Sequence, residues 1–434
     1  MIKRSFIGLT APRLKCDLVE PGPREPEMIP MPPRLILMLD EALDSTKETC
    51  IRKGDTAKKG ERLFLYKEST RYVTAPTSGT ITLIAPFTGD FGKNATYLVL
   101  EKDDKDEWVE GISEFADVPD LASADGVLRT LPGAPPLELL AAPNSSIKKI
   151  VISGMDSDLM STTRQYLTSK CMDDVKNGIE LLKNMTGITD VFMAIPEKMS
   201  QLSAFQGMNT IKLTEDYIGT LPQMIMKNHL GITPVAGTTC EDQGVCFMSI
   251  EAALSLARAY KDKAPVFDKV ITVIGKDGGV KRVRAVIGTP IHRILSQLGL
   301  ETQEMDRIII GGPLKGFSAY TLYHPVQPDM DTIIIQDSEQ IPGVSDYPCI
   351  NCGKCVRICP AGVPVNLLVR YLEANLYQEA VDSFDLDACI DCGLCSYVCT
   401  ARIPIFQYIK LGKHEQLMLE AEMEAEMETE AENA

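Results

Sequence analysis

The fold of the C-terminal part of this chain is decided by the stretch Cys349-Ile350-Asn351-Cys352-Gly353-Lys354-Cys355-Val356-Arg357-Ile358-Cys359-Pro360. A second stretch repeats the cysteine spacing and reads Cys389-Ile390-Asp391-Cys392-Gly393-Leu394-Cys395-Ser396-Tyr397-Val398-Cys399, followed by Thr400 instead of proline. Two residues between successive thiolates let one tight loop place three sulfur atoms on three corners of a cubane cluster. The two runs therefore predict iron–sulfur ligands.

The fourth corner of each cluster needs a cysteine from elsewhere. In ferredoxins with two clusters, the last cysteine of each run ligates the opposite cluster. We therefore predict two [4Fe-4S] clusters, one held by Cys349, Cys352, Cys355 and Cys399 and the other by Cys389, Cys392, Cys395 and Cys359. The alternative is structural zinc, which also uses cysteine pairs two residues apart but needs only four thiolates. Because every cluster corner is filled, the pattern favours an electron wire over a catalytic centre.

The other candidate residues show no such spacing. Cys16, Cys50, Cys171, Cys240 and Cys246 are bystander thiols in this interpretation, although the last two could bind a metal. The four histidines are scattered along the chain, and no acid–base dyad or nucleophile stands out, so we predict no catalytic residue.

Composition excludes some classes of protein. The formal charge of −16 argues against a general nucleic-acid binder, because phosphate contacts need clustered Lys and Arg. Residues 414–434 contain eight Glu and neither Lys nor Arg, which predicts a solvated acidic tail. No window of about 18 uninterrupted apolar residues exists, and Met1-Ile2-Lys3-Arg4-Ser5 is not followed by a secretory apolar stretch. We therefore expect a cytoplasmic protein.

Hydrophobic and turn patterns predict a multidomain chain that mixes α+β and α/β parts. Short β-type runs separated by Gly turns resemble the barrel-sandwich hybrid of carrier domains, but no Met-Lys pair marks a swinging arm, so this module is predicted to be structural. The predicted domains are an extended Pro-rich arm (1–33), a barrel-sandwich hybrid (34–110), an α/β domain (111–265), a β-grasp domain (266–340), a helical domain for two [4Fe-4S] clusters (341–413) and an acidic tail (414–434).

Individual elements follow from periodicity. We expect strands at 150–152, 190–196 and 307–310, a hairpin of 269–274 with 282–287, and helices over 161–185, 249–259, 291–298 and 365–381.

The whole chain resembles the RnfC family, peripheral subunits of Rnf ion-translocating electron-transport complexes. The resemblance spans roughly residues 5–413 and is carried by Pro76-Thr77-Ser78-Gly79-Thr80-Ile81, Asp106-Glu107-Trp108, Ile287-Gly288-Thr289-Pro290, Ile310-Gly311-Gly312-Pro313 and Cys395-Ser396-Tyr397-Val398-Cys399. It implies an α/β domain similar to the flavin subunit of respiratory complex I, an SLBB-like β-grasp domain, and attachment to the cytoplasmic face of the inner membrane through membrane subunits. Ferredoxin or a cytochrome is the implied redox partner.

The nucleotide loop departs from the family pattern. The family has Gly-Gly-Ala-Gly-Phe-Pro, whereas this chain has Leu131-Pro132-Gly133-Ala134-Pro135-Pro136, in which one glycine remains and prolines lack amide donors. The following acidic stretch is also altered, to Gly154-Met155-Asp156-Ser157-Asp158. We therefore expect weakened or lost binding of FMN and NADH. The alternatives are a divergent loop that still binds flavin, and a soluble flavin-dependent reductase similar to RnfC-like cobalamin reductases.

Overall fold

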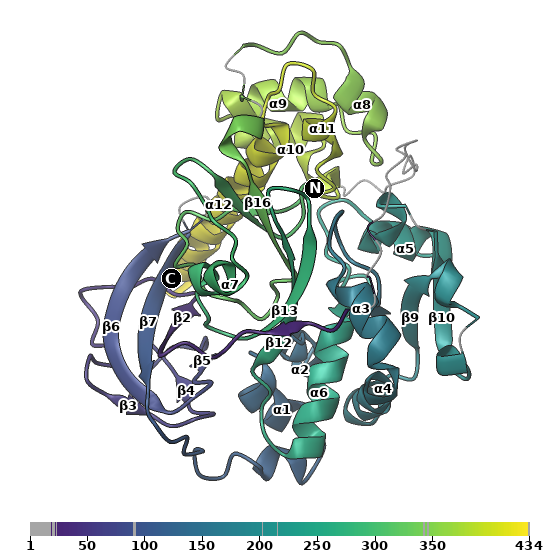
Figure 1. Ribbon diagram of the computed structural model, residues 1–434. Helices are drawn as coiled ribbons and strands as arrows, with labels where there is room; N and C mark the ends of the chain where they lie inside the picture. The colour runs from purple at the N-terminus through teal and green to yellow at the C-terminus, as the bar shows by residue number, and fades with distance from the viewer. Residues whose placement is uncertain are drawn as a thin grey trace. The chain divides into compact units, whose positions relative to one another are not determined.

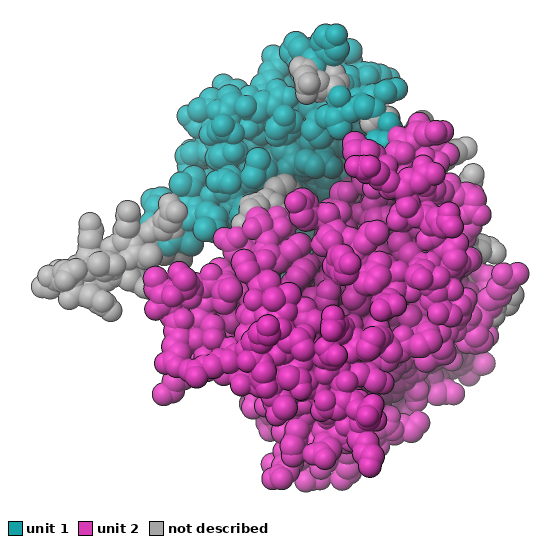
Figure 2. Space-filling model, turned by 60° about the vertical axis from the view of Figure 1, so that its left-hand side comes forward, with its two compact units in different colours: residues 1–17, 216–243, 341–434 teal, residues 18–215, 244–340 magenta. Residues whose placement is uncertain are grey.

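The computed structural model describes residues 24–432, together with residues 19 and 22, except residues 90–92, 202, 215, 342, 345 and 346. The chain divides into two compact units, one made of residues 1–17, 216–243 and 341–434 and the other of residues 18–215 and 244–340 (Figure 2). Most of the predicted Pro-rich arm, including Cys16, lies outside the described residues.

The larger unit contains the expected antiparallel sandwich. Its main sheet has the strand order β2-β7-β6-β3, and β4 and β5 form a separate ribbon. The strands are β2 (Arg34–Leu39), β3 (Thr56–Ala57), β4 (Arg62–Leu63), β5 (Val73–Thr74), β6 (Gly79–Thr88) and β7 (Asn94–Lys102). Alternate residues such as Leu37, Leu98 and Leu100 are buried in its core, as expected when successive side chains point to opposite faces of a sheet.

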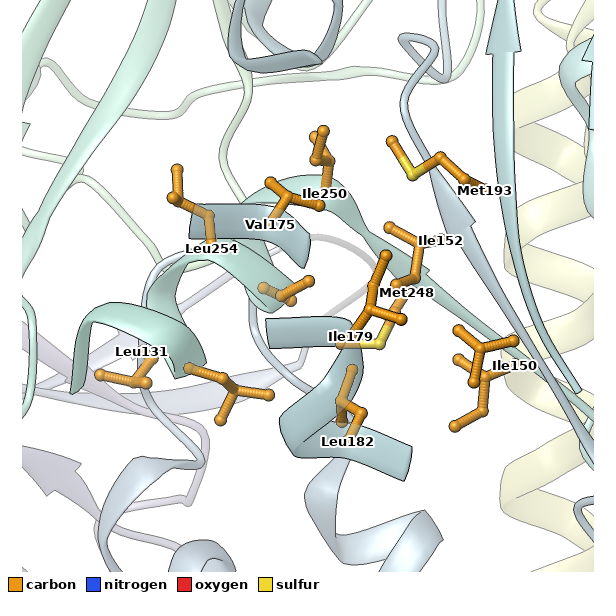
Figure 3. Close-up of a cluster of buried hydrophobic side chains, with 14 of the residues drawn as sticks. Leu131, Ile150, Ile152, Val175, Ile179, Leu182, Met193, Met248, Ile250 and Leu254 are labelled. Carbon is orange, nitrogen blue, oxygen red and sulfur yellow. The ribbon is translucent and has the colours of Figure 1, made fainter. Parts of the chain in front are cut away.

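A parallel sheet of order β10-β9-β8-β11 forms the α/β part. Its elements and the short helices before it are η2 (Glu114–Ala116), α1 (Leu121–Leu128), α2 (Leu137–Ala141), β8 (Lys149–Ser153), α3 (Thr163–Lys170), α4 (Met172–Thr186), β9 (Val191–Pro196), η3 (Glu197–Met199), η4 (Ser203–Phe205), β10 (Asn209–Leu213), β11 (Val245–Ser249) and α6 (Ile250–Asp262). Figure 3 shows Ile150 and Ile152 of β8 among buried side chains of α4 and α6. The single helix predicted over 161–185 is wrong, because the non-helical backbone of Cys171 separates α3 from α4.

A third sheet has the order β1-β13-β12-β16-β14-β15. Its elements are β1 (Glu27–Met28), β12 (Asp268–Ile274), β13 (Val280–Val286), α7 (Ile291–Gln297), β14 (Arg307–Ile310), β15 (Phe317–Ser318), β16 (Thr332–Gln336) and η6 (Ser338–Gln340). The predicted hairpin is confirmed, since β12 pairs antiparallel with β13 from Asp268↔Val286 to Ile274↔Val280. Arg282 of β13 donates to the carbonyl oxygens of Gly22 (2.5 Å) and Arg24 (2.9 Å), which ties down the end of the arm that becomes β1.

The smaller unit is helical. It contains η5 (Ile218–Thr220), α5 (Pro222–His229), α8 (Lys354–Ile358), α9 (Val365–Glu373), α10 (Tyr377–Phe384), η7 (Leu386–Ala388), α11 (Leu394–Tyr397) and α12 (Ile405–Glu432). Figure 1 draws α5 in teal and the helices from α8 onward in yellow-green to yellow. Leu368, Leu372 and Phe406 belong to its core. The single helix predicted over 365–381 is wrong, because the left-handed backbone of Asn375 (φ 57°) ends α9 and lets α10 start in a new direction. The acidic tail begins inside α12.

Residues 216–243 belong to the smaller unit, although the sequence assigned them to the α/β domain. They connect β10 to β11 without adding a strand to the sheet. The Tyr217 hydroxyl donates to the carbonyl oxygen of Cys392 (2.8 Å), and the Gly237 amide donates to that of Asp387 (3.2 Å). These long-range bonds, which no local pattern predicts, explain the grouping.

Within the described part of the chain, no helix is both long and apolar enough to cross a membrane.

The contact between α4 and α6 generates a first prediction. A Cβ at Gly178 of α4 would lie 2.2 Å from the carbonyl oxygen of Ala253 in α6, so Gly178→Ala must separate the two helices. We expect a loss of about 1–3 kcal/mol in stability, measured by denaturant unfolding. Gly126→Ala in α1 is the matched control, because its nearest neighbour would be 3.7 Å away. That variant should gain ~0.5–1 kcal/mol from helix propensity, and equal effects of the two changes would contradict the packing argument.

Candidate iron–sulfur site

The eight predicted cysteine ligands surround two cavities of the helical unit. Cavity A is lined by Cys349, Cys352, Cys355 and Cys399, and cavity B by Cys359, Cys389, Cys392 and Cys395. The empty volumes are nearly equal, about 350 Å³ for A and about 360 Å³ for B. Each cavity therefore receives three thiols from one run and the fourth from the other run.

The backbone of each run turns sharply around its cavity. Asn351 and Gly353 have positive φ angles of 57° and 69°, and the equivalent Asp391 and Gly393 have 53° and 72°. Alternating left-handed residues turn successive amides toward the concave side of a loop, where they can donate to sulfur. The Asn351 amide, for example, lies 3.4 Å from the sulfur of Cys349.

A longer repeat surrounds the fourth cysteines. The segments Cys359-Pro360-Ala361-Gly362-Val363-Pro364-Val365 and Cys399-Thr400-Ala401-Arg402-Ile403-Pro404-Ile405 share the same turn, in which the fourth residue has a φ of 70° or 56°. Val365 and Ile405 then begin the helices α9 and α12, and both line the cavities. The repeat thus covers each cavity with an apolar residue.

Thr400 breaks this symmetry chemically. Its hydroxyl lies 3.6 Å from the sulfur of Cys352, whereas the equivalent Pro360 carries no donor. The amide of Lys354 and this hydroxyl lower the pKa of the Cys352 thiol. On the other side, burial raises the pKa of Cys389 to about 12 and that of Cys392 to about 11. Because thiolates, not thiols, bind metal, loading cavity B must release protons.

Cavity B has partners that sequence reasoning missed. Lys413 of α12 donates to the carbonyl oxygen of Cys389 (2.7 Å) and to both carboxylate oxygens of Asp391 (3.0 and 2.9 Å). Tyr217 bonds to the carbonyl of Cys392 from 175 residues away in the sequence. In the sequence, only the place of Lys413 on the helix that begins at Ile405 hinted at its contact with cavity B. Nothing in the sequence around Tyr217 pointed to its contact with Cys392.

Gly133 and Ala134, which the family resemblance aligns with a nucleotide loop, lie in the turn between α1 and α2. The Gly133 amide donates to the carbonyl oxygen of Pro328 (2.7 Å), and the Ala134 amide to that of Leu131 (2.9 Å). A Cβ at Gly133 would lie 2.3 Å from the amide nitrogen of Ala252 in the first turn of α6. The loop is therefore packed against that helix, with its amides used inside the protein.

The altered acidic stretch is also committed to the fold. Asp156 accepts from the amide of Arg164 (2.9 Å) at the start of α3, and Asp158 accepts from the amides of Leu314 (3.2 Å) and Lys315 (2.7 Å). Burial raises the pKa of both carboxyls, although these amide donors oppose the shift. Both side chains thus accept hydrogen bonds from backbone amides inside the protein.

The remaining thiols are separate from the two cavities. Cys246 is buried in the core around β11, whereas Cys240 is partly exposed in the other unit, and burial raises its pKa to about 12. Among the described residues, no group of three or more His, Cys, Asp or Glu side chains converges on a single ion position.

Two protein families match parts of the chain. Residues 348–403 match the 4Fe-4S dicluster domain, and residues 24–105 match the RnfC barrel sandwich hybrid domain. The chain thus carries the N-terminal domain of the RnfC family. The domain order expected from the sequence, with an RnfC sandwich first and a dicluster domain near the C-terminus, is thereby confirmed for these two modules.

Curated relatives of the chain are named as subunits of larger complexes. It is 27% identical over 415 residues to the C subunit of the proton-translocating ferredoxin:NAD(+) oxidoreductase complex of Clostridium ljungdahlii, covering 90% of this chain and 89% of the relative. It is 27% identical over 355 residues to the C subunit of the ion-translocating oxidoreductase complex of Serratia proteamaculans, covering 77% of this chain and 50% of the relative. The chain thus spans about half the length of some curated relatives it matches.

Among solved structures, an NAD+-reducing [NiFe]-hydrogenase in the H2-reduced state aligns with 71% of this chain and 63% of its own, at 11% identity and a TM-score of 0.44. That likeness is too distant to assign a fold.

Thr400 supplies the prediction for this site. Thr400→Val removes the hydroxyl near the Cys352 sulfur and keeps the side-chain volume. A hydrogen bond to sulfur favours the reduced cluster, so we expect the cluster in cavity A to become harder to reduce, by about 0.5–1.5 kcal/mol. An anaerobic redox titration followed by electron paramagnetic resonance would measure the shift. The cluster in cavity B is the internal control, and a shift there alone would contradict the assignment.

Proposed function

We propose that this chain transfers single electrons through two [4Fe-4S] clusters as the peripheral, RnfC-like subunit of a membrane-bound, ion-translocating oxidoreductase complex. The observation that carries the proposal is the pair of nearly equal cavities, each lined by four cysteines. Bound there, each cluster would accept and return one electron. The names of the relatives, which are C subunits of ion-translocating oxidoreductase complexes, support the same kind of assembly.

We propose Cys349, Cys352, Cys355 and Cys399 as the ligands of cluster 1 in cavity A, and Cys389, Cys392, Cys395 and Cys359 as those of cluster 2 in cavity B. The chemistry of the donor set fits the group, because four thiols line each cavity and four-thiolate ligation is usual for [4Fe-4S] clusters. With four protein ligands, no iron keeps an open position for a substrate. The chain then acts as a relay without a catalytic centre of its own.

The helices hold the two cavities close together. Cys355 of cavity A lies in α8, and Cys359 of cavity B caps the same helix four residues later. Four residues of α-helix rise by about 6 Å. Cys395 and Cys399 repeat the arrangement around α11. One helical turn between ligands of opposite cavities supports fast electron exchange between the two clusters.

We infer that the chain no longer binds FMN or NADH through the loop at residues 131–136. Phosphate binding needs free backbone amides, and the amides of Gly133 and Ala134 already donate to protein carbonyls. Pro132, Pro135 and Pro136 have no amide to offer. The residues present therefore do not fit a nucleotide phosphate, and no electron step is assigned to a flavin.

The remaining modules are proposed as scaffold. Residues 266–340, with α7 beside the mixed sheet, suit an SLBB-like β-grasp domain, and residues 111–265 suit a domain similar to the flavin subunit of complex I. We propose that they attach the cluster domain to membrane subunits at the cytoplasmic face of the inner membrane. A ferredoxin or a cytochrome is the candidate redox partner.

Paired alanine variants test the ligand sets. Cys352→Ala should lose about half of the ~8 iron atoms expected for two clusters. Adding Cys399→Ala should change little more, because both residues serve cluster 1, whereas adding Cys359→Ala should remove nearly all the iron. Iron analysis after anaerobic purification measures this, with the exposed Cys50→Ala as control. The reverse order of the two double variants would show that each run builds its own cluster.

Flavin analysis and an NADH titration test the relay. We expect about eight iron atoms per chain, no bound flavin, and no bleaching of the cluster absorbance by NADH. Dithionite serves as the positive control for reducible clusters. Bound flavin together with bleaching by NADH would contradict the lost nucleotide site and would favour the flavin-dependent reductase.

A further inference from the structure

The two cavities differ in how open their ligand loops are. Ile350 and Ile390 occupy the same position of the two cysteine runs, yet Ile350 is 65% exposed and Ile390 only 6%. The following cysteines differ in the same way, since Cys352 is exposed and Cys392 is 7% exposed. The ligand loop at the edge of cavity A is therefore open to solvent, whereas the equivalent loop at the edge of cavity B is buried.

Charge is segregated along the same domain. Residues 347–372 contain three basic residues and no acidic one, and residues 393–413 also contain three basic residues and no acidic one. Between them, residues 373–392 contain six acidic residues and no basic one. The segment that carries the first run is thus basic in a chain whose net charge is −16, and the segment that leads into the second run is acidic.

The basic residues lie at the open edge of cavity A. Lys354 lines the cavity, Arg402 stands between the lining residues Ala401 and Ile403, and Arg357 donates to the carbonyl oxygen of Cys352 (3.3 Å). Lys354, Arg357 and Arg402 are all exposed. Within the described residues, none of these three side chains forms an ion pair with a carboxylate. Their positive charge is therefore available to a partner.

We propose that this edge of cavity A is the electron port of the chain, and that it docks an acidic redox protein or domain. This inference rests on the proposed electron relay, and it identifies the docking partner by its negative charge. Opposite charges steer encounter and raise association rates at low salt, whereas like charges near cavity B disfavour docking there. In the transfer, the partner would lose one electron to a cluster held by the cysteines of cavity A, with no bond made or broken, and the cysteines of cavity B would hold the next acceptor.

A charge-reversal experiment tests the port. The variant Arg402→Glu keeps Arg357, whose hydrogen bond supports a ligand loop, and Lys354, which lines the cavity. Lys67→Glu on an exposed position of the other unit is the control with the same change in net charge. A reduced, acidic two-cluster ferredoxin is the probe, and stopped-flow bleaching gives the second-order rate constant. We expect the port variant to be slower by ~10-fold or more at low salt, with the difference vanishing at high salt, and the control to change less than about twofold.

Two further readouts separate failure of the port from failure of the relay. Reduction by photoreduced 5-deazariboflavin, a small neutral donor, should be the same in all variants, as should the iron content. If the wild-type protein holds no iron or is not reduced by this donor, the relay itself is wrong. If it is reduced but the port variant reacts with ferredoxin as fast as the control, the port is wrong. A basic cytochrome should oxidise the reduced port variant faster than the reduced wild type, because the variant carries added negative charge. If the cytochrome instead oxidises the wild type rapidly and in a salt-sensitive way, docking belongs to the acidic side and the proposal is overturned.

Discussion

The helical unit depends on one constraint, which is that each cavity takes its fourth thiol from the opposite cysteine run. Neither run can complete a cavity alone, so residues 349–359 and 389–399 must fold together. The apolar residues that follow the fourth cysteines, Val365 and Ile405, begin α9 and α12 and line the cavities. The positions of the long helices are thus coupled to the ligand loops, and the hydrophobic core of the unit includes several of the cysteines themselves.

A second constraint, in the larger unit, fixes the position of the loop at residues 131–136. The Lys269 side chain is fully buried, and its ammonium lies 2.9 Å from a carboxylate oxygen of Glu251 and donates to the carbonyl of Pro328 (2.7 Å). The same carbonyl accepts the Gly133 amide (2.7 Å). A buried charge is tolerated only while it is paired. Any movement of the loop would therefore disturb the groups that solvate Lys269.

Sequence reasoning worked where a feature is local. The cysteine spacing and the β12–β13 hairpin could both be recognised within short windows. The breaks at Cys171 and Asn375 could not, because apolar periodicity continues across a change of helix direction. Residues 216–243 were misassigned for another reason, since Tyr217 finds its partner Cys392 through tertiary contact alone. Side-chain exposure could not be predicted from the sequence either, because Ile350 and Ile390 are the same residue type and differ only in their surroundings.

The two cysteine runs and the segments that follow them also differ in ways that folding alone does not require. Both halves keep the cysteines, the left-handed residues and the apolar covers, which suffice to build a cavity. They differ in Thr400 against Pro360, in Lys413 bound to Asp391, and in the exposure of the first loop. Each difference changes the hydrogen bonds, charge or solvent access around a ligand, and these are the properties that set cluster potentials. Two clusters in such unlike environments would give the proposed relay a direction, because the loop beside cavity A is open to a partner whereas the matching loop beside cavity B is buried in the protein.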